Sequence, residues 1–168
     1  MLRRLTIRDF VIVDRLDLEF AAGFGALTGE TGAGKSILLD ALGLALGGRG
    51  EAAMVRSGRE RADVAAEFDL PAGEGLAAWL VEQELPADEG MLILRRTIDM
   101  GGRSRAWING VAATLAQLRA AGEWLADIHG QHAHHALLRT DAQRALLDAQ
   151  AGAGALVAEV AARHREWQ

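Results

Sequence analysis

A glycine-rich segment of eight residues constrains this chain more than any other part of its sequence. It reads Gly29-Glu30-Thr31-Gly32-Ala33-Gly34-Lys35-Ser36, the G-x-x-x-x-G-K-[ST] pattern of a phosphate-binding loop. Glycines let the backbone adopt conformations that a Cβ would forbid, so successive N–H groups can turn toward a phosphate chain. Lys35 is the only lysine among 18 Lys and Arg residues. An ammonium kept at that position indicates a role that the wide guanidinium of arginine cannot fill.

The flanking residues fit such a loop. Residues 25–28 (Gly-Ala-Leu-Thr) are expected to form a short strand that enters it, and residues 37–46 a helix that leaves it. This helix is apolar almost all round, which predicts that it is buried. A glycine-rich turn without a ligand is the alternative, and the flanking strand and helix argue against it.

The chemistry of the motif assigns roles to its residues. Lys35 is expected to reach the β- and γ-phosphates of ATP, and the Ser36 hydroxyl to bind Mg²⁺. Nucleotide binding is therefore predicted for Gly29, Glu30, Thr31, Gly32, Ala33, Gly34, Lys35, Ser36 and Ile37.

Composition limits the class of protein. A chain of 168 residues that is 50% hydrophobic can form one domain with a core. The absence of cysteine excludes disulfides, thiolate metal sites and thiol catalysis. A net charge of −5 gives no overall basic footprint, so DNA contact would need a local patch. No long apolar run is present, which predicts a soluble, cytoplasmic protein without a membrane partner.

Alternation of apolar and polar residues predicts most of the other elements. Strands are expected over residues 1–8, 11–20, 63–70, 91–98 and 103–108, with an irregular stretch over residues 54–61. Asn109-Gly110 is the strongest hairpin signal and indicates an antiparallel meander. A short helix is expected over residues 76–83, and capping boxes predict helix starts at Thr114 and Thr140. Residues 124–128 could form one more buried strand, and Trp107 and Trp124 are expected in the core.

The C-terminal segment has a different pattern. Ala153, Val157, Val160, His164 and Trp167 follow the 4-3-4-3 spacing of a coiled-coil seam. The pattern is still running at Gln168, so we expect a truncated piece of a longer protein. The expected organisation is a lobe over residues 1–139 and the helical start of a coiled-coil arm over residues 140–168.

Hydrolysis of ATP also requires acidic groups, and these are not evident. Residues 91–94 form an apolar run that ends in Arg95-Arg96, and Asp40 lies on the helix after the loop. Residues 124–127 (Trp-Leu-Ala-Asp) are the nearest but weak candidate, and no Leu-Ser-Gly-Gly type signature occurs. The sequence therefore predicts half of an active site, which alone would be essentially inactive.

The order of the motifs resembles that of the RecN family of bacterial DNA repair proteins, in the SMC-like branch of the ABC ATPases. The resemblance rests on the loop near residue 30 and on three segments: Leu2-x-x-Leu5-x-Ile7-x-x-Phe10, Gly43-Leu44-Ala45-Leu46-Gly47-Gly48-Arg49, and Asp127-Ile128-His129-Gly130-Gln131-His132 followed by Leu137-Leu138. It runs over most of the chain, and the Ile-His-Gly-Gln-His segment is more specific than the loop.

The resemblance implies an α/β fold: one half of a P-loop ABC/SMC-type ATPase head, with a mixed sheet and an antiparallel meander around the P-loop helix. It implies that the C-terminal half of the same protein supplies the Walker B acids and the signature motif after a coiled coil. It makes Gln131 the Q-loop residue, which touches Mg²⁺ or the attacking water. It further implies a homodimer of heads around ATP, DNA as a partner, and a role in double-strand-break repair and recombination.

Alternatives remain open at this point. Another SMC-like head, RecF-like or nuclease-associated, would share the loop, as would a small-molecule kinase, although no substrate lid or acidic base is evident. His129, His132, His134 and His135 could bind a metal, but loop packing is the simpler interpretation without cysteine. Arg56, Arg59 and Arg61, and likewise Arg103 and Arg105, could contact phosphate or form a solvated face.

Overall fold

The computed structural model describes residues 1–28, 34–70, 74–86, 90–126 and 140–167. Internal contacts divide the chain into two compact units, Met1–Asp127 and Ile128–Gln168, and each is described by itself. The predicted loop residues 29–33, Gln131 and the four clustered histidines lie outside the described residues.

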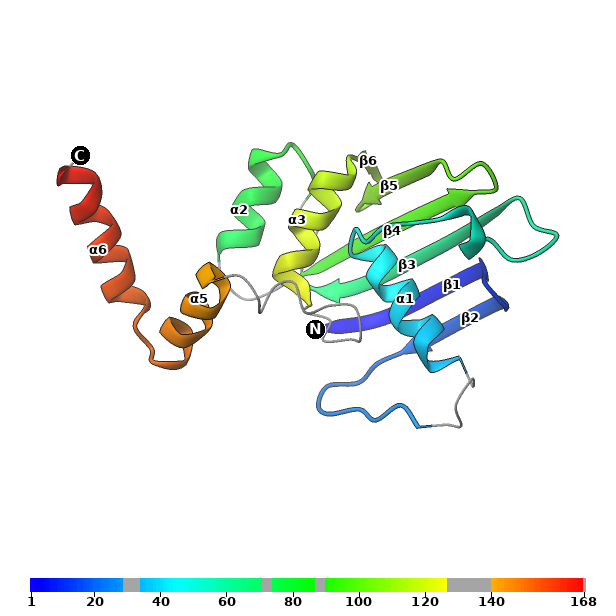
Figure 1. Ribbon diagram of the computed structural model, residues 1–168, viewed down its shortest axis with the longest axis horizontal. Helices are drawn as coiled ribbons and strands as arrows, with labels where there is room; N and C mark the ends of the chain where they lie inside the picture. The colour runs from blue at the N-terminus through cyan, green and yellow to red at the C-terminus, as the bar shows by residue number, and fades with distance from the viewer. Residues whose placement is uncertain (29–33, 71–73, 87–89, 127–139, 168) are drawn as a thin grey trace. The chain divides into compact units, whose positions relative to one another are not determined.

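The first unit is built on a six-stranded sheet (Figure 1). Its spatial order is β2-β1-β3-β4-β5-β6, and every neighbouring pair is antiparallel. The strands predicted over residues 1–8, 11–20, 63–70, 91–98 and 103–108 are confirmed, as is the antiparallel meander, which β3 to β6 form. The strands are β1 (Leu2–Phe10), β2 (Val13–Glu19), β3 (Arg61–Asp69), β4 (Met91–Asp99), β5 (Ser104–Ile108) and β6 (Val111–Ala113).

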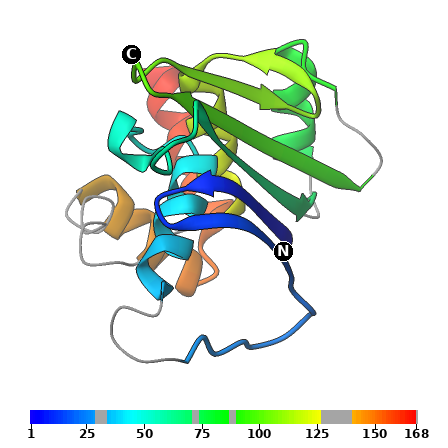
Figure 2. The same cartoon turned by 90° about the vertical axis from the view of Figure 1, so that its right-hand side faces the viewer.

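Helices cover one face of this sheet (Figure 2). Helix α1 (Lys35–Ala45) packs against β3 and β4, and α3 (Leu115–Leu125) packs against β5. On β3 the predicted inward residues Val64, Ala66 and Phe68 are fully buried. Period-two alternation therefore identified the face of β3 that contacts the helices.

The β5–β6 turn has the conformation that its sequence demands. Asn109 and Gly110 have φ values of 47° and 80°, the left-handed pair of a type I′ turn. The Asn109 side chain also accepts a hydrogen bond from the Ile93 N–H at 2.7 Å and donates one to the Pro86 carbonyl at 2.8 Å. The side chain of a turn residue thus ties the hairpin to β4 and to the segment before it.

Helix α3 starts at the predicted capping box. The Thr114 hydroxyl accepts a hydrogen bond from the Gln117 N–H at 3.2 Å, and the Gln117 side chain accepts one from the Thr114 N–H at 2.9 Å. Each bond satisfies an N–H that the helix leaves without an internal partner.

Replacing Thr114 with alanine should therefore lower the free energy of unfolding by about 1 kcal/mol, the usual cost of losing an N-cap. Urea denaturation followed by circular dichroism measures this change. Thr114→Ser keeps the hydroxyl and is the matched control, expected within about 0.5 kcal/mol of the parent. Equal losses in the two variants would contradict the capping role.

Three expectations are wrong. Residues 25–28 form no strand: no described strand pairs with them, all four are exposed, and the neighbouring Phe24 is 100% exposed. Trp124 lies in α3 rather than in a strand and is 53% exposed. Helix α1 is buried on one side only, since Leu39 is 51% exposed.

The remaining elements are helical. A 3₁₀ helix, η1 (Ala52–Met54), ends where the predicted irregular stretch begins, and α2 (Glu74–Glu82) is close to the expected helix. In the second unit, α5 (Thr140–Gln150) begins at the predicted threonine and α6 (Gly154–Trp167) follows Gly152, whose φ is 64°. No described residue of α6 is buried, so the coiled-coil seam stays a prediction.

Candidate nucleotide-binding site

The N-terminal end of α1 is the centre of the candidate site. Gly34 precedes the helix in the left-handed conformation, with φ 86° and ψ 4°. A side chain rarely adopts this conformation, so glycine is required at this step of the loop. The helix then begins at Lys35, which places Lys35 and Ser36 on its first turn.

This helix end can receive an anion. Its N-cap residue, Gly34, has no side chain, no side-chain cap comes from the described residues, and the first turn contains no acidic residue. The first hydrogen bond of the helix runs from the Leu38 N–H to the Gly34 carbonyl at 3.2 Å, so the N–H groups of residues 35–37 come before the internal ladder. Lys35 is half-buried and Ser36 is exposed. Backbone donors, the positive helix end, one ammonium and one hydroxyl fit the phosphates of a nucleotide with Mg²⁺.

The sheet holds α1 in place through its buried side. Ala41, Leu44 and Ala45 are at most 2% exposed and belong to the hydrophobic core. Complete burial of a leucine side chain contributes about 1.5–3 kcal/mol. The helix is therefore fixed along its length by contacts remote from the loop.

Two arginines contact the other end of α1. The Arg119 guanidinium donates a hydrogen bond to the Gly47 carbonyl at 3.3 Å, and that of Arg96 lies 3.5 Å from the Gly48 carbonyl. Gly47 has a φ of 91°, and a Cβ there would lie 2.8 Å from backbone atoms of Arg119. Cations near the C-terminal carbonyls of a helix are favourable.

Sequence reasoning missed this anchor, although a signal was present. Arg96 occupies an inward position in the alternation of β4, between Leu94 and Ile98, which are both fully buried. An arginine on the apolar side of a strand indicates a partner inside the fold.

Arg56 and Arg59 form ion pairs with carboxylates at the β1–β2 turn. The Arg56 guanidinium lies 2.7 Å from the Asp14 carboxylate, and that of Arg59 lies 3.1 Å from Asp9. Asp9 and Val11 have φ values of 49° and 52°, an unusual conformation for these residues. The ion pairs and the hydrogen bond from the Val11 N–H to the Met54 carbonyl hold this turn against the segment after α1.

Two further arginines, Arg103 and Arg95, also have carboxylate neighbours. Arg103 pairs with Asp99 at 2.8 Å. Arg95 donates to Asp63 at 3.0 Å and lies over the ring of Trp107, 5.2 Å from its centroid. The hydrogen bond to Asp63 raises the pKa of Arg95 above its ordinary value. Trp107 is half-buried beside this pair, so the prediction that it lies in the core is only partly met.

The described residues supply no Walker B strand. Trp124 and Leu125, the best candidates, belong to α3, so they cannot form the strand before an acidic residue. No cluster of three or more metal-ligating side chains occurs within the described ranges. Among the described helices, none is long and apolar enough to cross a membrane.

A family model described as "AAA domain" matches residues 4–91, slightly more than half of the chain. The chain belongs to this family. The matched residues contain most of β1, the loop, α1 and β3, so the family match includes the start of α1.

The relatives confirm the resemblance to the RecN family. DNA repair protein RecN of Vibrio cholerae is 45% identical over 168 residues, which cover all of this chain and 30% of the relative. RecN of Haemophilus influenzae is 45% identical over 170 residues, with the same two shares. The chain thus spans about 30% of the length of these curated relatives.

Solved structures confirm the fold class. A structure from work on ATP-driven dimerisation and DNA-stimulated activation of SMC ATPases has a TM-score of 0.60 and 23% identity. It matches 88% of this chain and 97% of its own. A Pyrococcus furiosus Smc head domain, 25% identical, has a TM-score of 0.58 and covers 72% of this chain and 33% of its own. The chain has the fold of one half of an SMC-type head.

Proposed function

We propose that this chain is the ATP-binding half of an SMC-like ATPase head that acts in DNA double-strand-break repair and recombination. The observation that carries the proposal is the start of α1, where Gly34 in the left-handed conformation is followed at once by Lys35 and Ser36. The repair role follows from 45% identity to proteins named DNA repair protein RecN.

Within this proposal, residues 29–37 hold the phosphates of ATP through backbone N–H groups. Lys35 adds a mobile positive charge at the β- and γ-phosphates, and Ser36 with Gln131 contributes oxygen ligands to Mg²⁺. When bound, Mg²⁺ neutralises charge between these phosphates. Gln131 would orient the attacking water, and the acid that completes hydrolysis would come from elsewhere in the full protein.

Exposed apolar residues support a missing second half. Phe24 is 100% exposed, Leu27 55% and Leu39 51%, and all three lie just before the loop or on α1. Apolar side chains gathered beside a functional loop are typical of a surface that another protein part covers. We infer that the C-terminal half of the same protein covers them. Residues 1–139 would then form the lobe and residues 140–168 the start of the coiled-coil arm.

The proposal extends to partners. ATP-driven dimerisation and DNA-stimulated activation belong to the SMC ATPases named above; for this chain we infer a homodimer of heads around ATP, DNA as a further partner, and a nucleoid-associated place in the cytoplasm. A RecF structure shares the fold with a TM-score of 0.51 at 19% identity. The identity to RecN is more than twice as high and favours RecN-type repair over a RecF-like role.

The chain alone is expected to hydrolyse ATP negligibly, because its acidic partners are elsewhere. Adding a separately produced C-terminal half of a RecN relative should give turnover, measured as phosphate release. Lys35→Ala should abolish this turnover. Robust hydrolysis by the chain alone would contradict the split-head proposal.

Phe24 offers a matched control for the association. Phe24→Ala should weaken binding of the C-terminal half, measured by titration calorimetry, while ATP binding by the chain itself is unchanged. Val81→Ala removes a side chain that is 69% exposed on α2 and should leave both measurements unchanged. If both variants bind the C-terminal half equally well, the surface around Phe24 is not part of the interface.

A further inference from the structure

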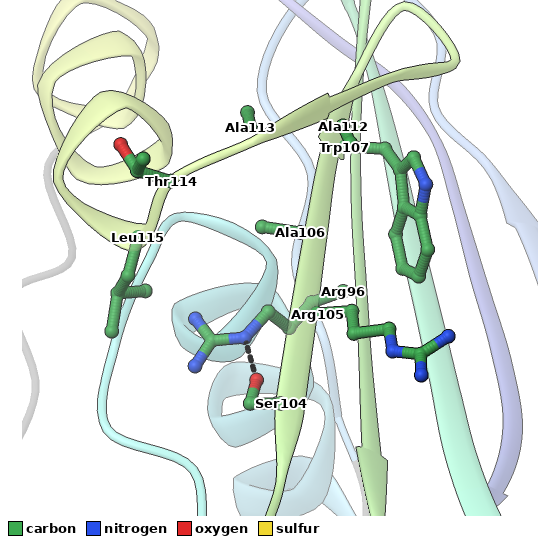
Figure 3. Close-up of a pocket in the computed structure, with 9 residues that line it drawn as sticks. All are labelled: Arg96, Ser104, Arg105, Ala106, Trp107, Ala112, Ala113, Thr114 and Leu115. Atoms are coloured by element: carbon green, nitrogen blue, oxygen red, sulfur yellow. Dashed lines mark hydrogen bonds between the residues drawn. The ribbon is translucent and has the colours of Figure 1, made fainter.

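An open cavity of about 350 Å³ lies at the edge of the sheet, between β5, the end of β6 and the first residues of α3 (Figure 3). Its lining contains two arginines and no acidic residue. The cavity is separate from the nucleotide site. It adjoins the C-terminal end of α1, whereas the nucleotide site lies at the N-terminal end of this 11-residue helix, which is about 16 Å long. The lining residues are Arg96, Ser104, Arg105, Ala106, Trp107, Ala112, Ala113, Thr114 and Leu115.

Arg96 carries a buried charge at this cavity. Its residue exposure is 3%, and it donates a hydrogen bond from Nε to the Ser104 hydroxyl (Figure 3). Its hydrogen bond to the Gly48 carbonyl is long, at 3.5 Å. No ion pair joins Arg96 to a carboxylate of the described residues. Burial, and then the nearby charge of Arg119, lower its pKa.

A buried guanidinium in this setting favours an anion. Removing a charge from water is costly unless an opposite charge and further hydrogen bonds compensate it. A guanidinium has five N–H donors, and the two contacts use at most two of them. Its remaining donors can bind a carboxylate in a two-point arrangement.

The edge of β5 is also incomplete at this cavity. Strand β6 ends at Ala113, which lies opposite Ala106, and the chain then enters α3. The backbone carbonyl of Arg103 and the backbone N–H of Asn109 form hydrogen bonds with β4. Backbone groups of successive residues point to opposite sides of a strand, so the N–H and C=O of Ser104 point away from β4. No described strand residue lies opposite Ser104 there.

We propose that this cavity binds an acidic peptide segment in extended conformation, contributed by a partner protein. The segment would pair with the backbone of Ser104 and place one carboxylate against Arg96. Alternate side chains of an added strand point to opposite faces. Figure 3 shows the Arg96 guanidinium on one side of β5, and Arg105 with Trp107 on the other, so each face offers a cation. The walls of Ala106, Ala113 and Leu115 suit a peptide better than a free phosphate.

The test uses the 168-residue chain and a blocked five-residue peptide with a central Glu flanked by valines. Calorimetry and amide chemical shifts should detect binding at Ser104 and Leu115. A peptide with Gln at the centre should bind at least about tenfold more weakly, since it loses a charge-assisted contact. Arg96→Met should reduce binding of the Glu peptide by a similar factor. Arg103→Gln, which changes an arginine paired with Asp99 outside the cavity, should have no effect.

A second pair of variants is informative even if Arg96→Met does not fold. Leu115→Glu places a carboxylate in the cavity and should block the peptide, and it should raise Tm relative to Leu115→Gln. The difference in Tm between Ala116→Glu and Ala116→Gln measures how much a carboxylate gains from the N-terminal end of α3 alone. Ala116 suits this control because it is exposed and does not line the cavity. Equal affinity for the Glu and Gln peptides would overturn the proposal. Saturation by inorganic phosphate with no response to the peptide would also overturn it.

Discussion

Lys35→Ala should weaken ATP binding by about tenfold to a hundredfold. Lys35 lies on the first turn of α1, and under the proposed function its ammonium forms a charge-assisted interaction with phosphate. Such interactions contribute about 1.5–3 kcal/mol, and each 1.4 kcal/mol corresponds to a factor of ten. Titration calorimetry with ATP and Mg²⁺ measures the change.

Two controls make the Lys35 result specific. Lys35→Arg keeps the charge but should still bind weakly, because a wide planar guanidinium does not replace a compact ammonium at the phosphates. Arg49→Ala removes a cation whose side chain is 89% exposed and should bind ATP as the parent does. Thermal melts should show that all three variants are folded. If Lys35→Ala binds ATP as tightly as the parent, Lys35 is not part of the nucleotide site.

Phe68→Ala should lower the free energy of unfolding by about 3–5 kcal/mol, the usual cost of truncating a buried aromatic residue. Phe68 is 0% exposed on β3, with Leu2 of β1 and Leu92 of β4 opposite it in the neighbouring strands. The substitution leaves a cavity between the sheet and its helices that rigid neighbours cannot fill. Urea denaturation followed by circular dichroism measures the loss.

Phe24→Ala is the matched control for this prediction, since it deletes the same atoms from a side chain that is 100% exposed. Surface substitutions of this kind usually change stability by less than about 0.5 kcal/mol. A large loss at Phe24, or a loss below about 1 kcal/mol at Phe68, would contradict the burial of these residues.

Patterns that act over a few residues were predictable from the sequence. The left-handed Asn109-Gly110 pair and the capping box of Thr114 and Gln117 form as expected, since both depend on neighbours in the chain. The motif also predicts a helix after the loop, and α1 begins at Lys35, two residues before the expected range of residues 37–46. Alternation also identified the inward face of β3, because a buried sheet face selects apolar residues at every second position.

Contacts between distant segments were not predictable. Residues 25–28 have the composition of a strand, but a strand needs a neighbour, and the described sheet provides none for them. Arg56 reads as a member of a solvated or phosphate-binding cluster, yet it pairs with Asp14, 42 residues away. Trp124 was expected in a strand because of its apolar neighbours, and α3 extends through it instead.

The sequence by itself determined the phosphate-binding motif, the single lysine within it and the local turns and caps, since glycine conformation and short-range hydrogen bonds act within a few residues. Only the tertiary structure decided which elements became neighbours. It placed Arg96 of β4 and Arg119 of α3 at the C-terminal end of α1, and it left the side chain of Phe24 exposed. These outcomes depend on the summed packing of side chains far apart in the chain, which no local pattern encodes.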